Sequence, residues 1–257
     1  MSFERIEKNG VVFFRSTLLP CPHAFTTRLG GVSAEAHLAS LNLGNNRGDD
    51  PANVIENFRR IFEAAGLPED FVSARQIHSK TVLFTRETLD GQPELDGFCT
   101  DARGLTLCVK VADCIPILLC DKDAGVIAAL HAGWRGTAAG IAAEGVRKMV
   151  EVGAKPENVV AAIGAGIGSC CFEVKEDFVA EFTALAGKET ARDFISSREG
   201  RFYADLKGAN VKVLANAGVK REHIDVCPLC TCCDPDLFFS HRASGGKRGT
   251  MAALIAL

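Results

Sequence analysis

Residues 105–137, LTLCVKVADCIPILLCDKDAGVIAALHAGWRGT, decide the fold of this chain. Three apolar runs within this stretch are nearly continuous: 105–111, 115–120 and 126–130. Runs of this kind are typical of β-strands that are covered on both faces. Asp113 and Cys114 separate the first two runs, and His131 ends the third. The stretch therefore predicts a buried sheet that carries polar and reactive side chains at the ends of its strands.

Helix and strand signals flank this sheet in the sequence. The clearest helix is predicted at 51–65, where Asp50 is a good N-cap, Pro51 suits the first helical position and Gly66 can end the helix. Further helices are predicted at 137–152 with Thr137 as N-cap, at 177–186 and at 206–217. Further strands are predicted at 10–15, 23–27, 82–85, 159–163 and 251–257.

The order of these elements is irregular, and no repeat or low-complexity linker divides the chain. We therefore expect one domain, residues 1–257, of mixed sheets covered by helices rather than a doubly wound nucleotide-binding fold. The irregular stretch 28–50 is long enough to suggest a functional loop. The glycine-rich run at 163–168 lacks the G-x-G-x-x-G spacing of dinucleotide sites, so a tight loop lining a pocket is the better interpretation.

The composition is that of an ordinary globular protein, with 47% hydrophobic and 24% charged residues among 257. A net charge of −3 supplies no basic excess to neutralise phosphates, so neither nucleic acid nor a membrane is expected as a partner. The first residues do not form a signal peptide, and no apolar run approaches the roughly 18 residues of a membrane span. We expect a cytoplasmic protein.

Two histidines and one cysteine, His78, Cys114 and His131, form the strongest candidate site. Imidazole and thiolate are good zinc ligands, and a zinc with three protein ligands keeps a fourth position open for substrate or water. Each residue alone is more often structural, but Asp113 beside Cys114 interrupts an apolar strand at a considerable cost if it is buried unpaired. Gln76 lies next to His78 and could orient a ligand. The trio predicts a metalloenzyme or a Cys–His enzyme.

The turn at 133–137, GWRGT, leads from a predicted strand into a predicted helix and contains the single tryptophan. Backbone N–H groups at a helix N-terminus favour an anion such as phosphate, and Arg135 could add charge. The turn is not a P-loop, because the Gly-Lys-Ser/Thr ending is absent. Most glycine turns are only turns, so this motif is weak by itself.

The eleven cysteines need a separate explanation. Without a secretory signal, reduced thiols or metal ligands are favoured over disulfides. Three cysteines lie in apolar runs, where we expect plain packing: Cys99, Cys108 and Cys120. The run CPLCTCC at 227–233 could bind a structural zinc or form a redox pair. No second ligand pair follows Cys233, however, so we expect partly exposed reduced thiols there.

These segments, taken in order, resemble one family. Its members are described as polyphenol oxidase or laccase-domain proteins, as peptidoglycan editing factors and as zinc-dependent purine nucleoside phosphorylases. The matching motifs are FTTRLGGVS at 25–33, SLNL at 40–43, GDD at 48–50, QIH at 76–78, DG at 96–97, ADCIP at 112–116, HAGWRG at 131–136, CT at 230–231 and FFSHR at 238–242.

The resemblance implies a single-domain α/β (α+β) fold of stacked mixed β-sheets flanked by helices, similar to a cysteine-hydrolase-like toxin. It implies a zinc ion held by His78, Cys114 and His131. It also implies phosphorolysis of adenosine, guanosine, inosine and methylthioadenosine, and deamination of adenosine. Three polar residues would then lie near the nucleoside: Arg28, Asn42 and Gln76.

The leading hypothesis is accordingly a zinc enzyme acting on purine nucleosides and phosphate. Cys114 and His131 would belong to the catalytic centre, Asp113 would handle a proton or orient a ligand, and Arg28 or Arg135 would neutralise phosphate. The first rival is a metal-free hydrolase of a cell-wall precursor amide bond, with Cys114 as nucleophile and His131 as base. A copper phenol oxidase is less favoured because the chain has only six histidines. A zinc-stabilised binding module and any oligomeric state stay open.

Overall fold

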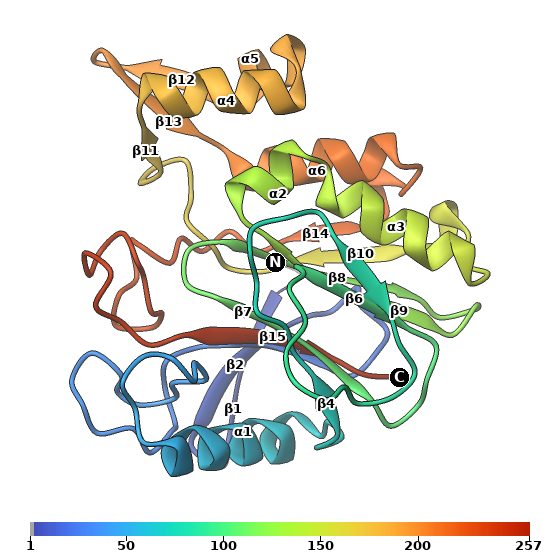
Figure 1. Ribbon diagram of the computed structural model, residues 1–257, viewed down its shortest axis with the longest axis vertical. Helices are drawn as coiled ribbons and strands as arrows, with labels where there is room; N and C mark the ends of the chain where they lie inside the picture. The colour runs from blue at the N-terminus through green and yellow to red at the C-terminus, as the bar shows by residue number, and fades with distance from the viewer. Residues whose placement is uncertain (1–2) are drawn as a thin grey trace.

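The computed structural model describes residues 3–257 as two stacked sheets between layers of helices (Figure 1). Sheet I has the strand order β14 (Ile224–Val226), β10 (Val160–Ile163), β8 (Ile115–Asp121), β9 (Val126–Ala132), β6 (Gly97–Thr100) and β5 (Val82–Phe84). Sheet II has the order β1 (Phe3–Lys8), β2 (Val11–Ser16), β3 (His23–Thr26), β15 (Met251–Ile255), β7 (Thr106–Val111) and β4 (Phe71–Val72). Both sheets mix parallel and antiparallel pairs, as expected.

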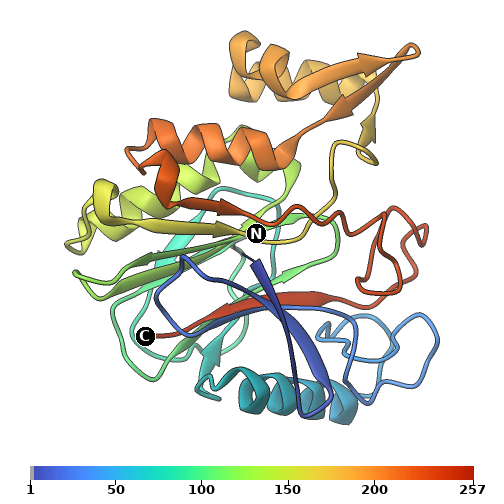
Figure 2. The same ribbon diagram turned by 180° about the vertical axis from the view of Figure 1, so that it is seen from behind.

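Helices cover the outer face of each sheet. Three of them pack on sheet I: α2 (Trp134–Ala138), α3 (Ile141–Glu151) and α6 (Leu206–Asn216). The outer face of sheet II is covered by α1 (Pro51–Ala65). A projecting unit at one end holds α4 (Glu176–Ala186), α5 (Lys188–Phe194) and the small sheet of β11 (Glu173–Val174), β13 (Arg201–Ala204) and β12 (Ile195–Arg198) (Figure 2). Two short 3-10 turns, Pro156–Asn158 and Arg221–His223, complete the described elements.

The apolar run of β8 shows why both sheets are needed. Ile115, Ile117 and Leu119 pack toward the helices, whereas Leu118 and Cys120 pack between the two sheets. Each of these five side chains is fully buried. An uninterrupted apolar strand is thus the expected consequence of having a covered layer on either side.

The hairpin of β8 and β9 sets the position of the reactive residues. In its antiparallel register, Ile115 lies opposite Ala132 and Pro116 lies opposite His131. Cys114, directly before β8, is therefore placed beside His131 at one end of sheet I. The two strands bring together side chains that are 17 positions apart in the chain.

The helix predicted at 51–65 is confirmed, whereas the single helix predicted at 137–152 is wrong. The side chain of Asp50 accepts a hydrogen bond from the backbone N–H of Ala52, and Gly66 ends α1 in the left-handed conformation. The helix predicted at 137–152 instead begins at Trp134 and breaks at Gly140, which has a φ of 83°. Its interruption follows from the positive φ, which glycine adopts at little cost.

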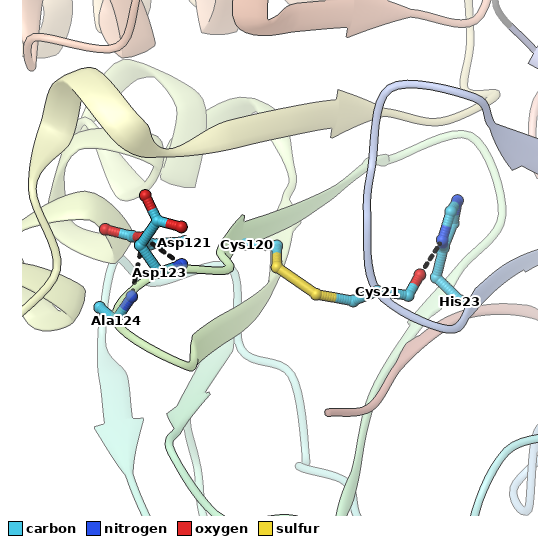
Figure 3. Close-up of a disulfide and its surroundings, with 6 residues drawn as sticks. All are labelled: Cys21, His23, Cys120, Asp121, Asp123 and Ala124. Atoms are coloured by element: carbon cyan, nitrogen blue, oxygen red, sulfur yellow. Dashed lines mark hydrogen bonds between the residues drawn. A yellow bond between two sulfur atoms is a disulfide. The ribbon is translucent and has the colours of Figure 1, made fainter.

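The interpretation of Cys120 as a reduced packing residue is wrong. Cys120, in β8, forms a disulfide with Cys21, 99 residues away and just before β3 (Figure 3). The bond links sheet I to sheet II. Cys99 and Cys108 are free and buried, as predicted. Among residues 3–257, no helix has the length and apolar character needed to cross a bilayer.

Candidate functional site

The structure brings His78, Cys114 and His131 together at the end of sheet I. The Sγ atom of Cys114 lies 3.8 Å from Nε2 of His78, and one ligand atom of each of the three residues lies within 4.8 Å of the others. Zinc–sulfur bonds of about 2.3 Å and zinc–nitrogen bonds of about 2.0 Å place tetrahedral ligand atoms roughly 3.6 Å apart. The donor set and its spacing therefore fit a zinc ion.

A buried carboxylate, Asp96, positions both histidines. Its Oδ1 atom lies 2.8 Å from Nδ1 of His131 and accepts the backbone N–H of His78 at 3.0 Å. Its Oδ2 atom accepts the backbone N–H and the hydroxyl of Ser79, at 2.6 and 2.8 Å. With Nδ1 of His131 held in this way, Nε2 is left for a metal. The same contacts stabilise His78 at a φ of 62°, an uncommon conformation for a residue other than glycine.

Two glycines in the HAGWRG motif make room for the segment that carries His78. A Cβ atom at Gly133 would lie 2.4 Å from Cδ2 of His78, and a Cβ atom at Gly136 would lie 2.8 Å from the carbonyl oxygen of Ser79. Neither position can hold a side chain without moving its neighbour. The glycines of this turn thus serve close packing at the cluster, and Gly133 is the N-cap of a helix only five residues long.

Asp113 orients the backbone beside Cys114. It is buried and has a φ of 85°. Its Oδ1 atom accepts the hydroxyl of Thr231 at 2.6 Å, and its Oδ2 atom accepts the backbone N–H of Arg242 at 2.7 Å and the hydroxyl of Ser240 at 3.1 Å. These three donors occupy both oxygens of the carboxylate. These contacts suit a residue that fixes the backbone next to Cys114, and the predicted roles of Asp113 in proton handling or in orienting a ligand stay predictions.

The cluster favours an ionised thiol. Burial alone raises the pKa of Cys114, but the charge of His131 and hydrogen bonds from both histidines outweigh it and lower that pKa to about 6. Burial lowers the pKa of His131, but the Cys114 thiolate and the Asp96 carboxylate outweigh it and raise that pKa to about 9. A thiolate is the form of cysteine that binds metals and attacks electrophiles.

Two pockets meet at the cluster and share four lining residues: His78, Ala112, Cys114 and Arg248. The first, of about 390 Å³, is polar and cationic. Its charged lining residues are Arg47, Arg75, Lys110 and Arg248. The second, of about 370 Å³, has a mainly apolar wall. That wall is formed by Trp134, Ile167, Phe172 and Leu206. A ligand with an anionic part and a flat apolar part would span the cluster.

Of the four substrate-contact residues expected from the sequence, only Gln76 lines the cationic pocket. Its amide pairs with the backbone of Lys110 through two hydrogen bonds of 2.7 Å, so it anchors the His78 segment to β7. Asn42 is fully buried and bonds to Gly44 and Asp49.

The two arginines expected to neutralise phosphate have other partners. Arg28 directs its guanidinium at the backbone carbonyls of Ala36, Ala39 and Pro235. Arg135 is exposed, pairs with Glu181 at 2.9 Å and stacks on Trp134. Neither of them lines the two pockets at the cluster.

Sequence reasoning missed the three arginines that line the cationic pocket, Arg47, Arg75 and Arg248. Among the described residues, Nε of Arg47 and Nε of Arg248 are buried without a hydrogen-bond partner. Burial, and then the charge of Arg47, lower the pKa of Arg248 to about 10, which still leaves it cationic at neutral pH. The available signal was weak: Arg47 lies in the irregular stretch suspected of being a functional loop, and Arg248 lies in a glycine-rich segment.

Comparisons with known proteins agree with this architecture. Residues 22–257 match the family described as multi-copper polyphenol oxidoreductase laccase. A Deinococcus radiodurans protein named purine nucleoside phosphorylase is 41% identical over 249 residues, covering 96% of this chain and 94% of that protein. The structure of YlmD from Geobacillus stearothermophilus has a TM-score of 0.86 at 33% identity, and that of the hypothetical protein YfiH from Bacillus licheniformis has 0.89 at 31%. Both cover 99% of this chain and 98% of the solved chain.

Proposed function

The chain belongs to the laccase-like family, and from this premise we propose that it is a zinc-dependent purine nucleoside phosphorylase that also deaminates adenosine. The relative from Deinococcus radiodurans carries the name purine nucleoside phosphorylase, which supports the first activity. The expected substrates are adenosine, guanosine, inosine and methylthioadenosine, with phosphate as the second reactant.

The observation that carries the proposal is the meeting of two unlike pockets at the Cys–His cluster. The cationic pocket offers Arg47 and Arg248, whose guanidinium charges suit a phosphate. The apolar pocket offers Trp134 and Phe172, whose rings suit a purine base. A nucleoside with its base in the second pocket would present its ribose near Cys114.

His78, Cys114 and His131 would hold the zinc, which supplies a Lewis acid with an open coordination position. In phosphorolysis, a phosphate oxygen forms a bond to C1′ of the ribose while the bond from C1′ to the purine nitrogen breaks. Arg47 and Arg248 would bind the phosphate and hold it in line for that displacement. Asp96 would keep the imidazole of His131 oriented, and the apolar pocket would exclude water from the base.

In deamination of adenosine, the oxygen of water would form a bond to C6 of the purine while the bond from C6 to the amino nitrogen breaks and ammonia leaves. The same cluster would serve both reactions, with C1′ of the ribose beside it in phosphorolysis and C6 of the purine beside it in deamination. Zinc is proposed rather than copper because the cluster offers two histidines and one thiolate, whereas multicopper oxidation generally needs many clustered histidines. Elemental analysis of the protein purified without added metal tests this choice.

The decisive experiment is release of hypoxanthine from inosine with and without phosphate. Zinc-loaded protein should give phosphate-dependent release together with ribose 1-phosphate, and Cys114→Ala should abolish it. Cys99→Ala removes a buried thiol away from the cluster and is the matched control. Absence of phosphate-dependent release from the zinc-loaded wild type would refute the proposal.

One observation favours a second candidate, a metal-free thiol hydrolase. The Cys114 and His131 pair has the ionised thiol and the cationic imidazole that such an enzyme uses. The substrate would be an amide bond in a cell-wall precursor. Full activity after chelation, together with loss of activity on alkylation of Cys114, would select the hydrolase over the phosphorylase.

A further inference from the structure

A second cluster of cysteines lies outside the candidate active site. One Sγ atom from each of Cys170, Cys171, Cys230 and Cys233 lies within 4.8 Å of the others. The first pair follows the glycine-rich loop at 163–168, and the second pair belongs to the CPLCTCC run. The two loops run side by side, with a β-bridge between Gly166 and Cys230.

The cysteines of the CPLCTCC run are free, as expected from the sequence, and the grouping of two of them with Cys170 and Cys171 reopens the structural site that the sequence had made the less favoured alternative. A structural site was judged unfavourable because no ligand pair follows Cys233. The missing pair precedes the run instead, at Cys170 and Cys171. The spacing of Cys230 and Cys233 is the C-x-x-C spacing found in structural zinc sites.

The sulfur distances are those of a metal site rather than of disulfides. Sγ of Cys233 lies 3.5 Å from Sγ of Cys170 and 3.4 Å from Sγ of Cys171. A disulfide would need about 2.05 Å. Four sulfurs at about 2.3 Å from a zinc ion would lie roughly 3.8 Å apart in a tetrahedron. One cysteine in contact with two others also cannot be bonded to both.

Backbone and cationic groups around the cluster suit bound thiolates. The backbone N–H of Gly168 donates to Sγ of Cys230 at 3.1 Å. A glycine suits this position, because a Cβ atom there would lie 3.1 Å from Sγ of Cys170 and 3.3 Å from Cβ of Cys230. Lys207 donates through Nζ to the carbonyls of Cys227 at 2.8 Å and Leu229 at 2.6 Å, which places positive charge beside the turn.

We propose that Cys170, Cys171, Cys230 and Cys233 bind a structural zinc ion, separate from the ion at the candidate active site. All four positions of a tetrahedral zinc would be filled by thiolates, so the site is closed and structural in kind. Cys170 and Cys233 are exposed, which gives a metal ion a path from solvent.

The second zinc would brace the backbone beside the active site. Thr231, between two of the ligands in the chain, donates its hydroxyl to Asp113 at 2.6 Å. The backbone N–H of Ile167, three residues before Cys170, donates to the carbonyl of Asp113 at 2.8 Å. Both loops that hold the four cysteines thus contact the residue that precedes Cys114. Loss of this zinc should loosen Asp113 without removing a ligand from the other cluster.

The test uses the full chain with its active-site ligands removed, as His78→Ala, Cys114→Ala and His131→Ala together. This triple variant, purified with zinc and dialysed, should retain one zinc per chain, and X-ray absorption should show four sulfur neighbours at about 2.3 Å. Adding Cys233→Ser or Cys170→Ser should remove that zinc. Adding Cys232→Ser, in the same turn but outside the cluster, should leave it in place.

Several results would overturn the proposal. They are a folded triple variant without zinc, equal zinc loss from Cys232→Ser and Cys233→Ser, and disulfides among the four cysteines in protein isolated with free thiols blocked. Circular dichroism of each variant, compared with wild type, establishes that it is folded. Because the metal is counted in a chain lacking the catalytic ligands, the result is independent of whether the phosphorylase assignment holds.

Discussion

Oδ1 of Asp96 lies 2.8 Å from Nδ1 of His131, and the same oxygen accepts the backbone N–H of His78 at 3.0 Å. The carboxylate of Asp96 thus fixes two candidate metal ligands, His131 in strand β9 and His78 in a loop. Burial raises the pKa of Asp96, but hydrogen bonds from His131 and Ser79 outweigh it, and the net pKa is lowered. The group therefore stays ionised where both histidines need an acceptor.

Replacement of Asp96 should weaken the metal site without removing a ligand. In Asp96→Asn, the amide keeps one acceptor oxygen. Its NH₂ group cannot accept a hydrogen bond, so the donors that faced the other carboxylate oxygen lose their acceptor. We expect zinc affinity to fall roughly 10- to 100-fold, as measured by competition with a chromophoric chelator. Asp101→Asn, which removes a surface partner of Arg86, should leave affinity unchanged. Equal affinities for wild type and Asp96→Asn would contradict the positioning role.

A methyl group at Gly133 should displace His78. The added Cβ atom would lie 2.4 Å from Cδ2 of the imidazole, so the ring or its loop must move. Gly133→Ala should therefore bind zinc on the order of tenfold more weakly or worse, while far-ultraviolet circular dichroism stays like that of wild type. Arg135→Ala in the same turn removes an exposed ion pair with Glu181 and the stacking on Trp134 but no contact with His78, and it serves as control. Unchanged zinc binding in Gly133→Ala would show that the ring needs no such close fit.

Arg47 and Arg248 should govern the use of phosphate. Each can make charge-assisted hydrogen bonds of about 1.5–3 kcal/mol, so Arg47→Met or Arg248→Met should raise the KM for phosphate roughly 10- to 100-fold. The KM for inosine should change much less. Arg28→Met and Arg135→Met are the comparison, since neither side chain lines the cationic pocket. A larger increase in the KM for phosphate from Arg28→Met or Arg135→Met would show that these two residues bind the phosphate, as the sequence predicted.

His23 should make stability depend on pH between about 4 and 6.5. Burial lowers its pKa to about 4, and in the folded chain Nδ1 lies 2.7 Å from the carbonyl of Cys21 while Nε2 accepts the N–H of Ser16. The unfolded chain gains a proton near pH 6.5 but the folded chain does not, so stability falls as pH drops through this window. The loss should reach at most about 3 kcal/mol.

The measurement is the free energy of unfolding in urea at several pH values, for wild type and for His23→Gln. Subtraction of the two curves removes effects that both proteins share, including loss of bound metal in acid. The free energy of unfolding of wild type minus that of His23→Gln should increase as the pH rises from 4 to 6.5 and stay constant above that range. A constant difference over the whole range would show that His23 has an ordinary pKa.

The sequence predicted those parts of the fold whose signals are local or strongly periodic. The α1 helix was found with both ends because Asp50 and Gly66 each act within one turn of it. The hairpin of β12 and β13 was missed because each strand has only four residues and neither alternates between buried and exposed positions as a half-buried strand does. The break at Gly140 was missed because a single glycine is also tolerated within a helix.

In the candidate site, too, residues with a local sequence signal were predicted and residues that act through long-range contacts were not. His78, Cys114 and His131 stand in unusual local contexts, and the structure brings them together. Asp96 acts through contacts with residues 17 to 35 positions away, which no local pattern reveals. The unpartnered Nε atoms of Arg47 and Arg248 likewise exist only once the chain is folded.

The position of β15 within sheet II has a consequence for biosynthesis. Residues 251–255, near the C-terminus, pair with β3 on one side and β7 on the other. While the ribosome still shields this strand, β3 and β7 each present an unpaired edge, and the sheet cannot close. Closure of sheet II therefore waits for pairing between segments that are far apart in the chain, and a chaperone that covers exposed strand edges would act before that pairing forms.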